Sequence, residues 1–567
     1  MRFCCLRLRA IASSALTAIV AAHAVPAGAQ PAAGPAQVDQ RLGPKQDAPS
    51  VGAPIQIPTA PPPAPPKPDA AALTFALHGV VFEGNTVLPE RTLQAVAAPY
   101  VGKPVTLIQV NELAGRVAAA YRAAGYILVR AVVPPQQFDN GQLTIRIVEG
   151  YVDKVSIQGD AGGATQLLTA YGKRIAAARP LTKKVLEREL LLASDVSGLG
   201  VRSVLTASPT TPGAADLTLV VTPRPVEAFA SIDNRGSKYL GPEQLMGGVF
   251  FNNPFGGARR IGLNGTVTPD RGPDLAYGAA SLDQPLGSSG LRLFATASYT
   301  ATRPGQALRA LGTDGSALNL EGRLSYPIIR SRDLNLLASG GFAYRDVHSG
   351  NDATPTVFDD HIRSLDVGLY ANALDDWGGY STANLSLIQG LGILGATRMD
   401  SAEKSHAGAD GQYTRLVFEV THEHPLVPRL TLFVSASGQT SFNKSLLASE
   451  QYTLGGYAYD RAFDPSEATG DSGLAGRAEL RWMALDSLSR LTGIQPYGFY
   501  EGGQVWQVTA LPGTPQSQSL YSAGIGVRFA VLQRLNASLE WAAPLGPDAA
   551  NSSTRNARLF FSVGANF

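Results

Sequence analysis

The chain has 567 residues, with 47 Lys and Arg against 45 Asp and Glu, so its formal net charge is only +2. This balance gives no electrostatic reason for nucleic acid to be the main partner. Charged residues make up 16% and hydrophobic residues 44%, which excludes a helical membrane protein and a coiled coil. Two cysteines exclude a disulfide scaffold, and 60 glycines with 39 prolines disfavour a mostly helical fold. A soluble glycine-rich β protein or a membrane β-barrel remains.

Residues 1–29 have the pattern of a secretory signal peptide. Arginines near the N-terminus precede an apolar run at 10–22, and small residues at 27–29 fit a cleavage site. The run is too short to cross a bilayer as a helix, which needs about 20 residues. Both cysteines, Cys4 and Cys5, lie in this segment. We therefore expect an exported chain whose mature form has no disulfide and no cysteine nucleophile.

Residues 30–72 are predicted to be a proline-rich linker. Twelve prolines lie between positions 31 and 68, and such a segment buries too little apolar surface to fold. Within it, Ala36 to Leu42 has the spacing of one short helix.

Residues 73–151 are predicted to form a small α+β module. Its pattern indicates strands at 77–85, 126–133 and 143–148 and helices at 91–100 and 110–124, with a turn at Asn140-Gly141.

Residues 152–223 repeat this order in a shorter form. Strands are predicted at 154–157, 201–207 and 217–221, and helices at 164–178 and 183–196. The two segments therefore indicate two tandem α+β modules.

Residues 224–567 show no helical pattern and are predicted to form a transmembrane antiparallel β-barrel. Alternation with period two, as at 291–299, is separated by turn signals such as Pro285-Leu286-Gly287. Membrane barrels need strands of about 9–11 residues joined by turns and loops, so this length gives roughly 16 strands. The alternative is a series of soluble β-sandwiches, which the small, weakly charged side chains along the strands disfavour.

The last residues share one apolar face. Its members are Leu559, Phe561, Val563, Ala565 and Phe567, and such a face suits a closing strand that meets lipid. An aromatic C-terminus with Phe561 and Phe567 resembles the signal that barrel-assembly machinery reads.

The chain resembles the outer-membrane transporters of two-partner secretion, the family of the filamentous haemagglutinin and haemolysin exporters, over nearly the whole mature length. The first module resembles the first POTRA domain of that family, and the second module resembles a second one. The proline-rich stretch resembles the family's linker behind a plug helix, with Ala36 to Leu42 as the candidate for that helix. The residues that carry the likeness in the first module are Gly84, Asn85, Gly125, Tyr126, Pro134, Gln136, Gly141, Glu149 and Gly150.

Two further segments resemble the family's lid loop and the wall that anchors it. The loop region is 454–464, with Asp460, Arg461, Ala462 and Phe463 at its tip, and the wall segment is 499–503, with Glu501 and Gly503. The family usually has a Val-Arg-Gly tip and an aspartate on the wall. An arginine fork can bind a carboxylate through two hydrogen bonds, so Arg461 and Glu501 are the expected anchor, with Asp460 as a competitor for Arg461.

Other patterns in the chain give no catalytic, cofactor or metal site. The glycines at 390–395 match a dinucleotide fingerprint, but no helix follows them, and the Gly-Asp-Ser-Gly at 470–473 has no supporting histidine base. His422 and His424 are two residues apart on one strand, but a metal site would need a third ligand, and the sequence indicates none. We therefore expect no enzyme activity, no cofactor and no metal.

The resemblance implies an outer-membrane protein transporter with its POTRA domains in the periplasm. It would recognise an unfolded exoprotein, a large β-helical adhesin or cytolysin, and translocate it through the barrel to the cell surface. Its other partners would be outer-membrane lipid and the barrel-assembly machinery, with no nucleic acid. Two alternatives stay open: a barrel-assembly or insertion factor, and a passive porin or receptor.

Overall fold

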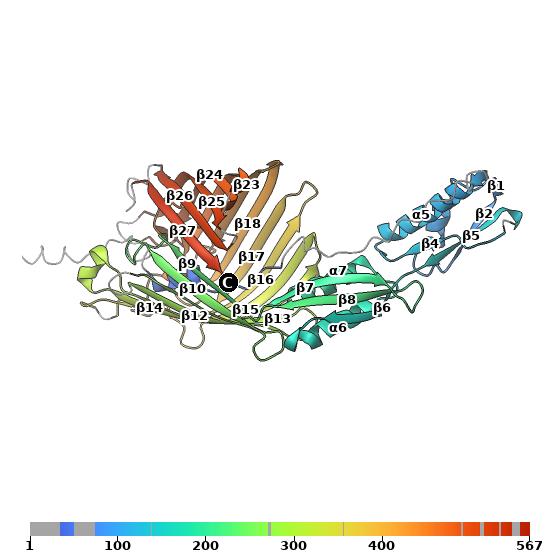
Figure 1. Cartoon of the computed structure of the whole chain (residues 1–567). Helices are drawn as coiled ribbons and strands as arrows, with labels where there is room; N and C mark the ends of the chain where they lie inside the picture. The colour runs from blue at the N-terminus through green and yellow to red at the C-terminus, as the bar shows by residue number, and fades with distance from the viewer. Residues whose placement is uncertain are drawn as a thin grey trace, which may run out of the picture.

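The computed structural model describes residues 34–49, 74–137, 139–269, 274–354, 356–488, 491–510, 515–531, 534–546 and 556–567. The predicted signal peptide and most of the proline-rich linker lie outside them. Figure 1 shows a barrel at one end and two small modules that extend from it in a row. None of the described helices is long and apolar enough to cross a membrane. The fold class predicted from the sequence is confirmed.

The first module packs two helices on a three-stranded sheet. Its elements are β1 (Thr74–Leu77), β2 (Gly79–Glu83), α4 (Glu90–Ala97), β3 (Lys103–Thr106), α5 (Leu107–Ala123), β4 (Arg130–Val132), η3 (Asp139–Gly141) and β5 (Gln142–Val148). The strand order is β2-β5-β4, with β2 parallel to β5 and β4 antiparallel to it. Leu93, Val117 and Leu143 are buried in its core.

The structure of this module differs from the predicted elements in three places. The separate antiparallel pair β1–β3 was not predicted, and its second strand has only four residues and includes Pro104. Only Arg130–Val132 of the strand expected at 126–133 pairs with β5. Helix α5 also begins earlier than expected, because Thr106 and Gln109 form a capping box at its N-terminus.

The second module repeats the arrangement with β6 (Val152–Gln158), η4 (Gly162–Ala164), α6 (Thr165–Ala177), α7 (Lys183–Ser194), β7 (Leu199–Ala207) and β8 (Ala215–Pro223). Its strand order is β6-β8-β7, with β6 parallel and β7 antiparallel to β8. The predicted order of elements is confirmed, and each bound is within three residues of the expected one.

The strands that follow the second module, apart from one short separate hairpin, close into an antiparallel barrel. They occupy sixteen positions, because the short β23 and the end of β22 share one place beside β24. The barrel closes where β27 pairs with β9. The strands are β9 (Val226–Asp233), β10 (Gln244–Asn252), β11 (Arg260–Val267), β12 (Leu275–Pro285), β13 (Arg292–Thr302), β14 (Asp314–Arg330), β15 (Leu334–Gly350), β16 (Phe358–Leu374), β17 (Tyr380–Gly390), β18 (Thr414–Val427), β19 (Leu430–Thr440), β22 (Ser472–Trp482), β23 (Leu485–Leu488), β24 (Leu491–Trp506), β25 (Ser517–Val531), β26 (Leu535–Leu545) and β27 (Arg558–Asn566).

Four described segments lie among these strands or before them. The helix α3 (Pro35–Leu42) precedes the modules in sequence, and the 3-10 turns η5 (Gln306–Leu311) and η6 (Ala448–Glu450) belong to loops of the barrel. A two-stranded hairpin of β20 (Tyr452–Leu454) and β21 (Ala468–Gly470) is separate from the barrel sheet.

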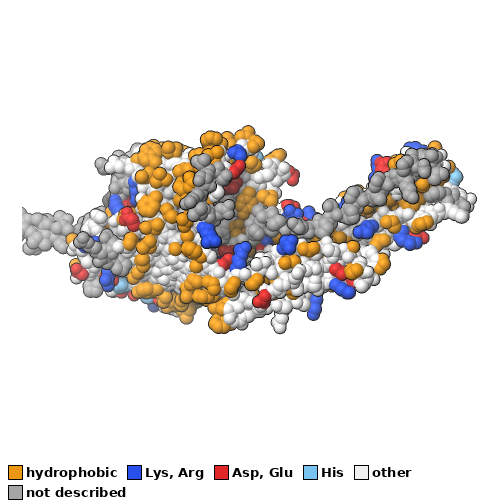
Figure 2. All heavy atoms as spheres, in the orientation of Figure 1, with side chains coloured by type: hydrophobic (Ala, Val, Ile, Leu, Met, Phe, Trp, Pro, Cys, Tyr) orange, Lys and Arg blue, Asp and Glu red, His pale blue; other side chains and the backbone are white. Residues whose placement is uncertain are grey.

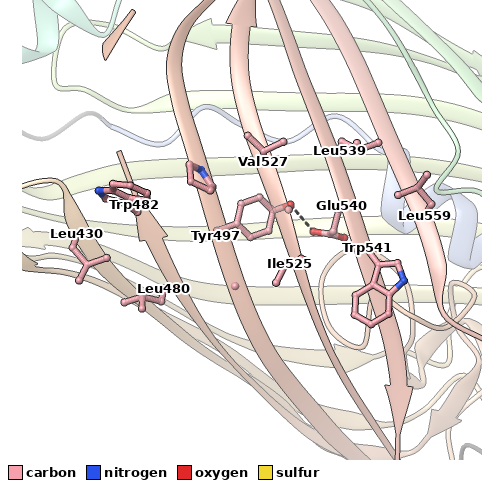
Figure 3. A pocket seen from close by; sticks show the side chains of 13 residues that line it. Leu430, Leu480, Trp482, Tyr497, Ile525, Val527, Leu539, Glu540, Trp541 and Leu559 are labelled. Atoms are coloured by element: carbon pink, nitrogen blue, oxygen red, sulfur yellow. Dashed lines mark hydrogen bonds between the residues drawn. The ribbon is translucent and has the colours of Figure 1, made fainter. Parts of the chain in front are cut away.

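The outer wall of the barrel is apolar. Figure 2 shows hydrophobic side chains spread over this wall, and alternate residues such as Tyr299, Val367 and Leu387 are exposed. A hollow of about 590 Å³ in the wall (Figure 3) has Trp482 and Ile525 among its lining residues. An apolar outer surface of this kind fits the hydrocarbon region of a bilayer.

Candidate functional site

The loop between β20 and β21 packs against the inner wall of the barrel. Leu454, Tyr459 and Phe463 from the hairpin and its loop share one buried cluster with wall residues that include Tyr497 and Phe499. The hairpin strands contact β22, β24 and β25. The segment that the sequence predicted as a lid loop therefore lies inside the lumen.

Arg461 at the tip of this loop is held by three carboxylates of the wall, and its side chain is 1% exposed. Its Nε lies 3.3 Å from Glu501 Oε2, its Nη2 lies 2.8 Å from Glu479 Oε2, and its Nη1 lies 2.6 Å from Glu540 Oε2. The backbone N–H of Arg461 donates a further hydrogen bond to Glu501. The guanidinium also lies over the ring of Phe499, 3.9 Å from its centroid.

The three glutamates come from three different strands, β22, β24 and β26. The structure places Glu501 beside Arg461 as the resemblance implied, but sequence reasoning missed Glu479 and Glu540. Only the strand register brings these inward positions together, and the sequence carries no sign of it. Because a buried arginine without carboxylate partners is costly, this arrangement favours one docked position of the loop.

Asp460 does not compete for Arg461, contrary to the expectation. It adopts a left-handed backbone conformation with φ of +60°. Its carboxylate oxygens are buried without a hydrogen-bond partner among the described residues. Asp460 instead shapes the turn, since its carbonyl accepts the N–H of Phe463. The residue of this turn with positive φ is Asp460, and aspartate tolerates positive φ better than most residues. Ala462 therefore needs no glycine-like conformation.

The wall makes room for the hairpin at Gly503. A Cβ added at Gly503 would lie 2.6 Å from Leu454 Cδ2 and 3.0 Å from Ala475 Cβ. These distances are shorter than van der Waals contact, so a larger residue here would require the Leu454 side chain, or β20 with it, to move away from β24. Gly503 therefore leaves space for Leu454 of the hairpin and supplies no binding group.

Helix α3 also lies inside the barrel. Val38 packs among Leu240, Leu275 and Leu308, and the carboxylate of Asp39 accepts a 2.5 Å hydrogen bond from Ser298, an inward residue of β13. This segment is the helix that the spacing of Ala36 to Leu42 predicted.

The helix also contacts the segment that leads into the lid hairpin. Gln37 Nε2 donates to the carbonyl of Ala448 at 2.9 Å, and Gln40 Nε2 donates to the carbonyl of Ser449 at 2.5 Å. Glu450, the next residue, binds Arg345 and Arg415 of the wall. Helix α3 and the loop hairpin are therefore joined through one short turn.

Glu149 is the centre of a hydrogen-bond network in the first module. Its carboxylate accepts the hydroxyl of Tyr121 at 2.9 Å and the backbone N–H groups of Thr86 and Val87 at 2.8 and 3.2 Å. Tyr121 also donates to Asn85 at 2.5 Å. Burial works to raise the pKa of Glu149, but these hydrogen bonds outweigh it and hold the pKa below its usual range. Burial and the contact with Glu149 raise the pKa of Tyr121.

The other motif residues of this module fix its backbone. Gly84 has φ of +82° and lies against the Ile147 carbonyl, where a Cβ would clash. The side-chain amide of Gln136 pairs with both backbone groups of Thr144 and also donates to the Pro134 carbonyl. Asn140 and Gly141 form the turn before β5, both with positive φ.

Three of these motif residues also connect the two modules. The carbonyl of Gly125 accepts the N–H of Lys183, and the carbonyl of Gly150 accepts the N–H of Leu181. Tyr126 forms an isolated bridge with Thr182. The motif therefore supports the shape of the module and its junction with the next one.

The second module is fixed to the barrel by charged contacts. Arg174 and Arg188 donate hydrogen bonds to Ser288 and Ser289 in the turn between β12 and β13. Asp195 binds Arg330 of the barrel through two hydrogen bonds of 2.7 and 2.8 Å. These contacts place the turn between β12 and β13 at the end of the barrel that faces the modules.

The two C-terminal phenylalanines lie where β27 meets β9. Phe567 exchanges backbone hydrogen bonds with Ala228, and its side chain is 76% exposed. Phe561 is half-buried, and its N–H donates to Asn234 Oδ1 at 2.8 Å. Both residues are therefore part of barrel closure.

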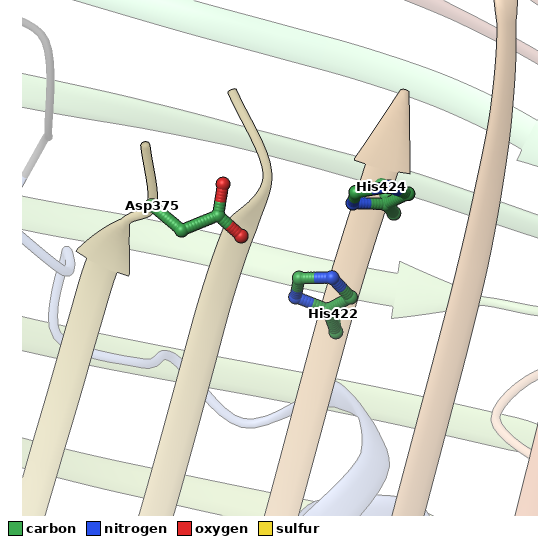
Figure 4. Close-up of side chains that lie close together, drawn as sticks. All are labelled: Asp375, His422 and His424. Carbon is green, nitrogen blue, oxygen red and sulfur yellow. The ribbon is translucent and has the colours of Figure 1, made fainter. Parts of the chain in front are cut away.

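His422 and His424 have a neighbouring carboxylate that the sequence did not indicate. Asp375, in the turn after β16, offers a carboxylate oxygen, and the ligand atoms of the three residues lie within 4.8 Å of one another (Figure 4). Sequence reasoning missed Asp375 because it is distant in the chain and is brought near only by the pairing of β17 with β18.

Comparison with known proteins gives two family matches. Residues 213–529 match the family described as haemolysin secretion/activation protein ShlB/FhaC/HecB. Residues 75–150 match the POTRA domain of ShlB type.

Individual proteins are similar over most of their length. The heme/hemopexin transporter protein HuxB of Haemophilus influenzae (strain 86-028NP) is 24% identical over 463 residues, which cover 79% of this chain and 80% of that protein. The outer membrane transporter CdiB of Dickeya dadantii (strain 3937) is 26% identical over 480 residues, 80% of each chain. The solved structure of CdiB from Escherichia coli has the same fold, with a TM-score of 0.71 at 22% identity, covering 90% of this chain and 94% of that one.

Proposed function

The chain belongs to the haemolysin secretion/activation family of ShlB, FhaC and HecB, and from this premise we propose how its barrel is closed and opened. It is an outer-membrane transporter of two-partner secretion, with its POTRA domains in the periplasm and a secreted exoprotein as its partner. The proposal concerns the residues that control the path of that exoprotein.

Two segments lie in the lumen of the barrel and would obstruct a passing polypeptide. The loop between β20 and β21 is anchored by Arg461, and helix α3 packs between the inner wall and the turn at Ala448 and Ser449. A polypeptide crosses the barrel only after both segments leave. The observation that carries the proposal is the binding of Arg461 by three glutamates from three strands, because it supplies a single docked position that can be released as a unit.

Recognition of the exoprotein is assigned to the modules. In the described sheets, β4 pairs only with β5, and β7 pairs only with β8, so β4 and β7 are edge strands. An unfolded chain can add a strand to such an edge, where main-chain hydrogen bonds give affinity without strict sequence demands. The modules would thus hold the client below the barrel. A large β-helical adhesin or cytolysin is the client class that this proposal names, and barrel-assembly machinery is the proposed partner during insertion, with Phe561 and Phe567 as its signal.

Secretion of a cognate exoprotein produced together with this chain tests the anchor. Arg461→Ala should reduce secretion while the barrel remains in the outer membrane. The matched control is Arg398→Ala, because Arg398 is 82% exposed and contacts only Asp400 among the described residues. Equal secretion by both variants would contradict the role given to Arg461.

Deletion of residues 76–222 tests the modules. The barrel should still insert, and secretion of that exoprotein should be lost. If depletion of the whole protein instead removed many outer-membrane barrels, the chain would be an assembly factor.

A further inference from the structure

Asp375, His422 and His424 lie at the periplasmic end of the barrel, outside the lumen. Turns of an antiparallel barrel alternate between its two ends. The turn between β12 and β13 contacts the second module through Ser288 and Ser289, so the turn between β16 and β17, which holds Asp375, lies at the same end. Glu423 binds the lumen residue Arg481, and side chains alternate along a strand, so the two histidines on either side of it face outward.

The carboxylate of Asp375 is held through one of its two oxygens. Its Oδ1 accepts the backbone N–H groups of Trp377 at 2.9 Å and Gly379 at 2.7 Å. These two bonds fix the side chain in the turn, and Figure 4 shows it extended toward His422. The second oxygen, Oδ2, is thereby aimed at the space between the turn and β18.

The ring of His422 is also oriented by a neighbour. Its Nδ1 lies 2.9 Å from Ser381 Oγ, which leaves Nε2 for another partner. The ring of His424 stacks beside it, with centroids 5.7 Å apart and planes inclined by 23°. A hydrogen bond to one ring nitrogen is the usual way in which proteins orient an imidazole that binds a metal through the other nitrogen.

The backbone leaves space between these groups. A Cβ added at Gly379 would lie 2.4 Å from Asp375 Oδ2 and 3.0 Å from His422 Cε1. Glycine at this position therefore lets the carboxylate and the imidazole approach each other. Two imidazole nitrogens and one carboxylate oxygen suit zinc and related divalent transition metals, whereas magnesium and calcium favour sites made of oxygen alone.

We propose that Asp375, His422 and His424 bind one divalent transition-metal ion of the zinc type on the outer face of the barrel at its periplasmic end. Water completes the coordination. The ion joins the turn after β16 to β18 across β17, so it fixes this part of the wall and takes no part in the passage of the client.

The test is zinc binding by the full mature chain without a histidine tag, in detergent, after treatment with a chelator. Competition against a chromophoric chelator should give one zinc ion per chain. His424→Ala and Asp375→Asn should each weaken binding at least tenfold, and His348→Ala, a substitution of another barrel histidine, should leave it unchanged. Asp375→Asn keeps a side-chain oxygen that can accept the N–H groups of the turn. Weaker zinc binding by this variant would therefore not be explained by a change in the turn.

Cobalt gives a second readout, because its visible absorption reports the ligands directly. The wild-type chain and His348→Ala should show the same cobalt spectrum, and His424→Ala should lose it. Heat-modifiable migration in gels verifies that each variant barrel is folded. Absence of stoichiometric zinc binding by the wild-type chain, or a zinc affinity in His424→Ala and Asp375→Asn equal to that of the wild-type chain, would overturn the proposal.

Discussion

Replacing Arg461 by alanine should release the loop from the wall. The substitution removes a cation shared by three buried glutamates. Two of them keep other arginine partners, whereas Glu501 has no further ion pair among the described residues. Breaking a buried ion pair by removing one partner costs about 3–5 kcal/mol. We use the lower value, about 3 kcal/mol, because the lumen admits water. Since about 1.4 kcal/mol corresponds to a tenfold change in an equilibrium constant, the undocked population should rise roughly 100-fold.

A single cysteine can report this change, because both native cysteines lie within the predicted signal peptide. Ala462 is buried in the docked loop, so a thiol in Ala462→Cys should react slowly with a water-soluble maleimide. In the double variant Ala462→Cys with Arg461→Ala, the reaction should be about 100-fold faster. Arg398→Ala in the same background should leave the rate unchanged. Equal rates in all three proteins would refute the reasoning that the arginine holds the loop.

Three other predictions concern the modules and the wall. The pKa of Glu149 is lowered in the folded module, so the stability that its charge contributes is complete above the ordinary glutamate pKa. This contribution is lost as the pH falls through the pKa of the folded state. Glu149→Gln should therefore remove this acid dependence, measured by urea unfolding that is followed by hydrogen exchange. Gly503→Ala should displace Leu454 of the hairpin from β24 and raise single-channel conductance, whereas Gly278→Ala, in open space on β12, should not. Asp195→Ala should remove both hydrogen bonds that Arg330 of the barrel donates to the second module, and cross-linking between module and barrel should then give several products instead of one.

Local chemistry explains which elements could be predicted. Helices α6 and α7 have clear apolar spacing, and Thr182 caps the second of them, so their bounds were close to the expected ones. The strands β1 and β3 are four residues long and stabilise each other only through tertiary pairing, and no local pattern distinguishes such strands from loops.

The residues of the candidate site also fall into two groups, those that the sequence could predict and those that required the structure. Arg461 and Glu501 could be selected because each lies in a segment that resembles a family motif. Glu479 and Glu540 lie in ordinary strand patterns, and their convergence depends on the stagger of β22, β24 and β26 in the closed barrel. Asp375 joins the two histidines only through the pairing of β17 with β18. Register in a barrel is a property of the closed sheet, so these contacts required the structure.

The most direct test of the gating account follows the loop while a client is in the barrel. An exoprotein that stalls during secretion should occupy the lumen, and the thiol of Ala462→Cys should then react quickly although Arg461 is intact. Without the client, the same thiol should stay protected. A stalled client that is exposed at the cell surface while the Ala462→Cys thiol remains protected would contradict the claim that the client passes through the lumen after the loop leaves.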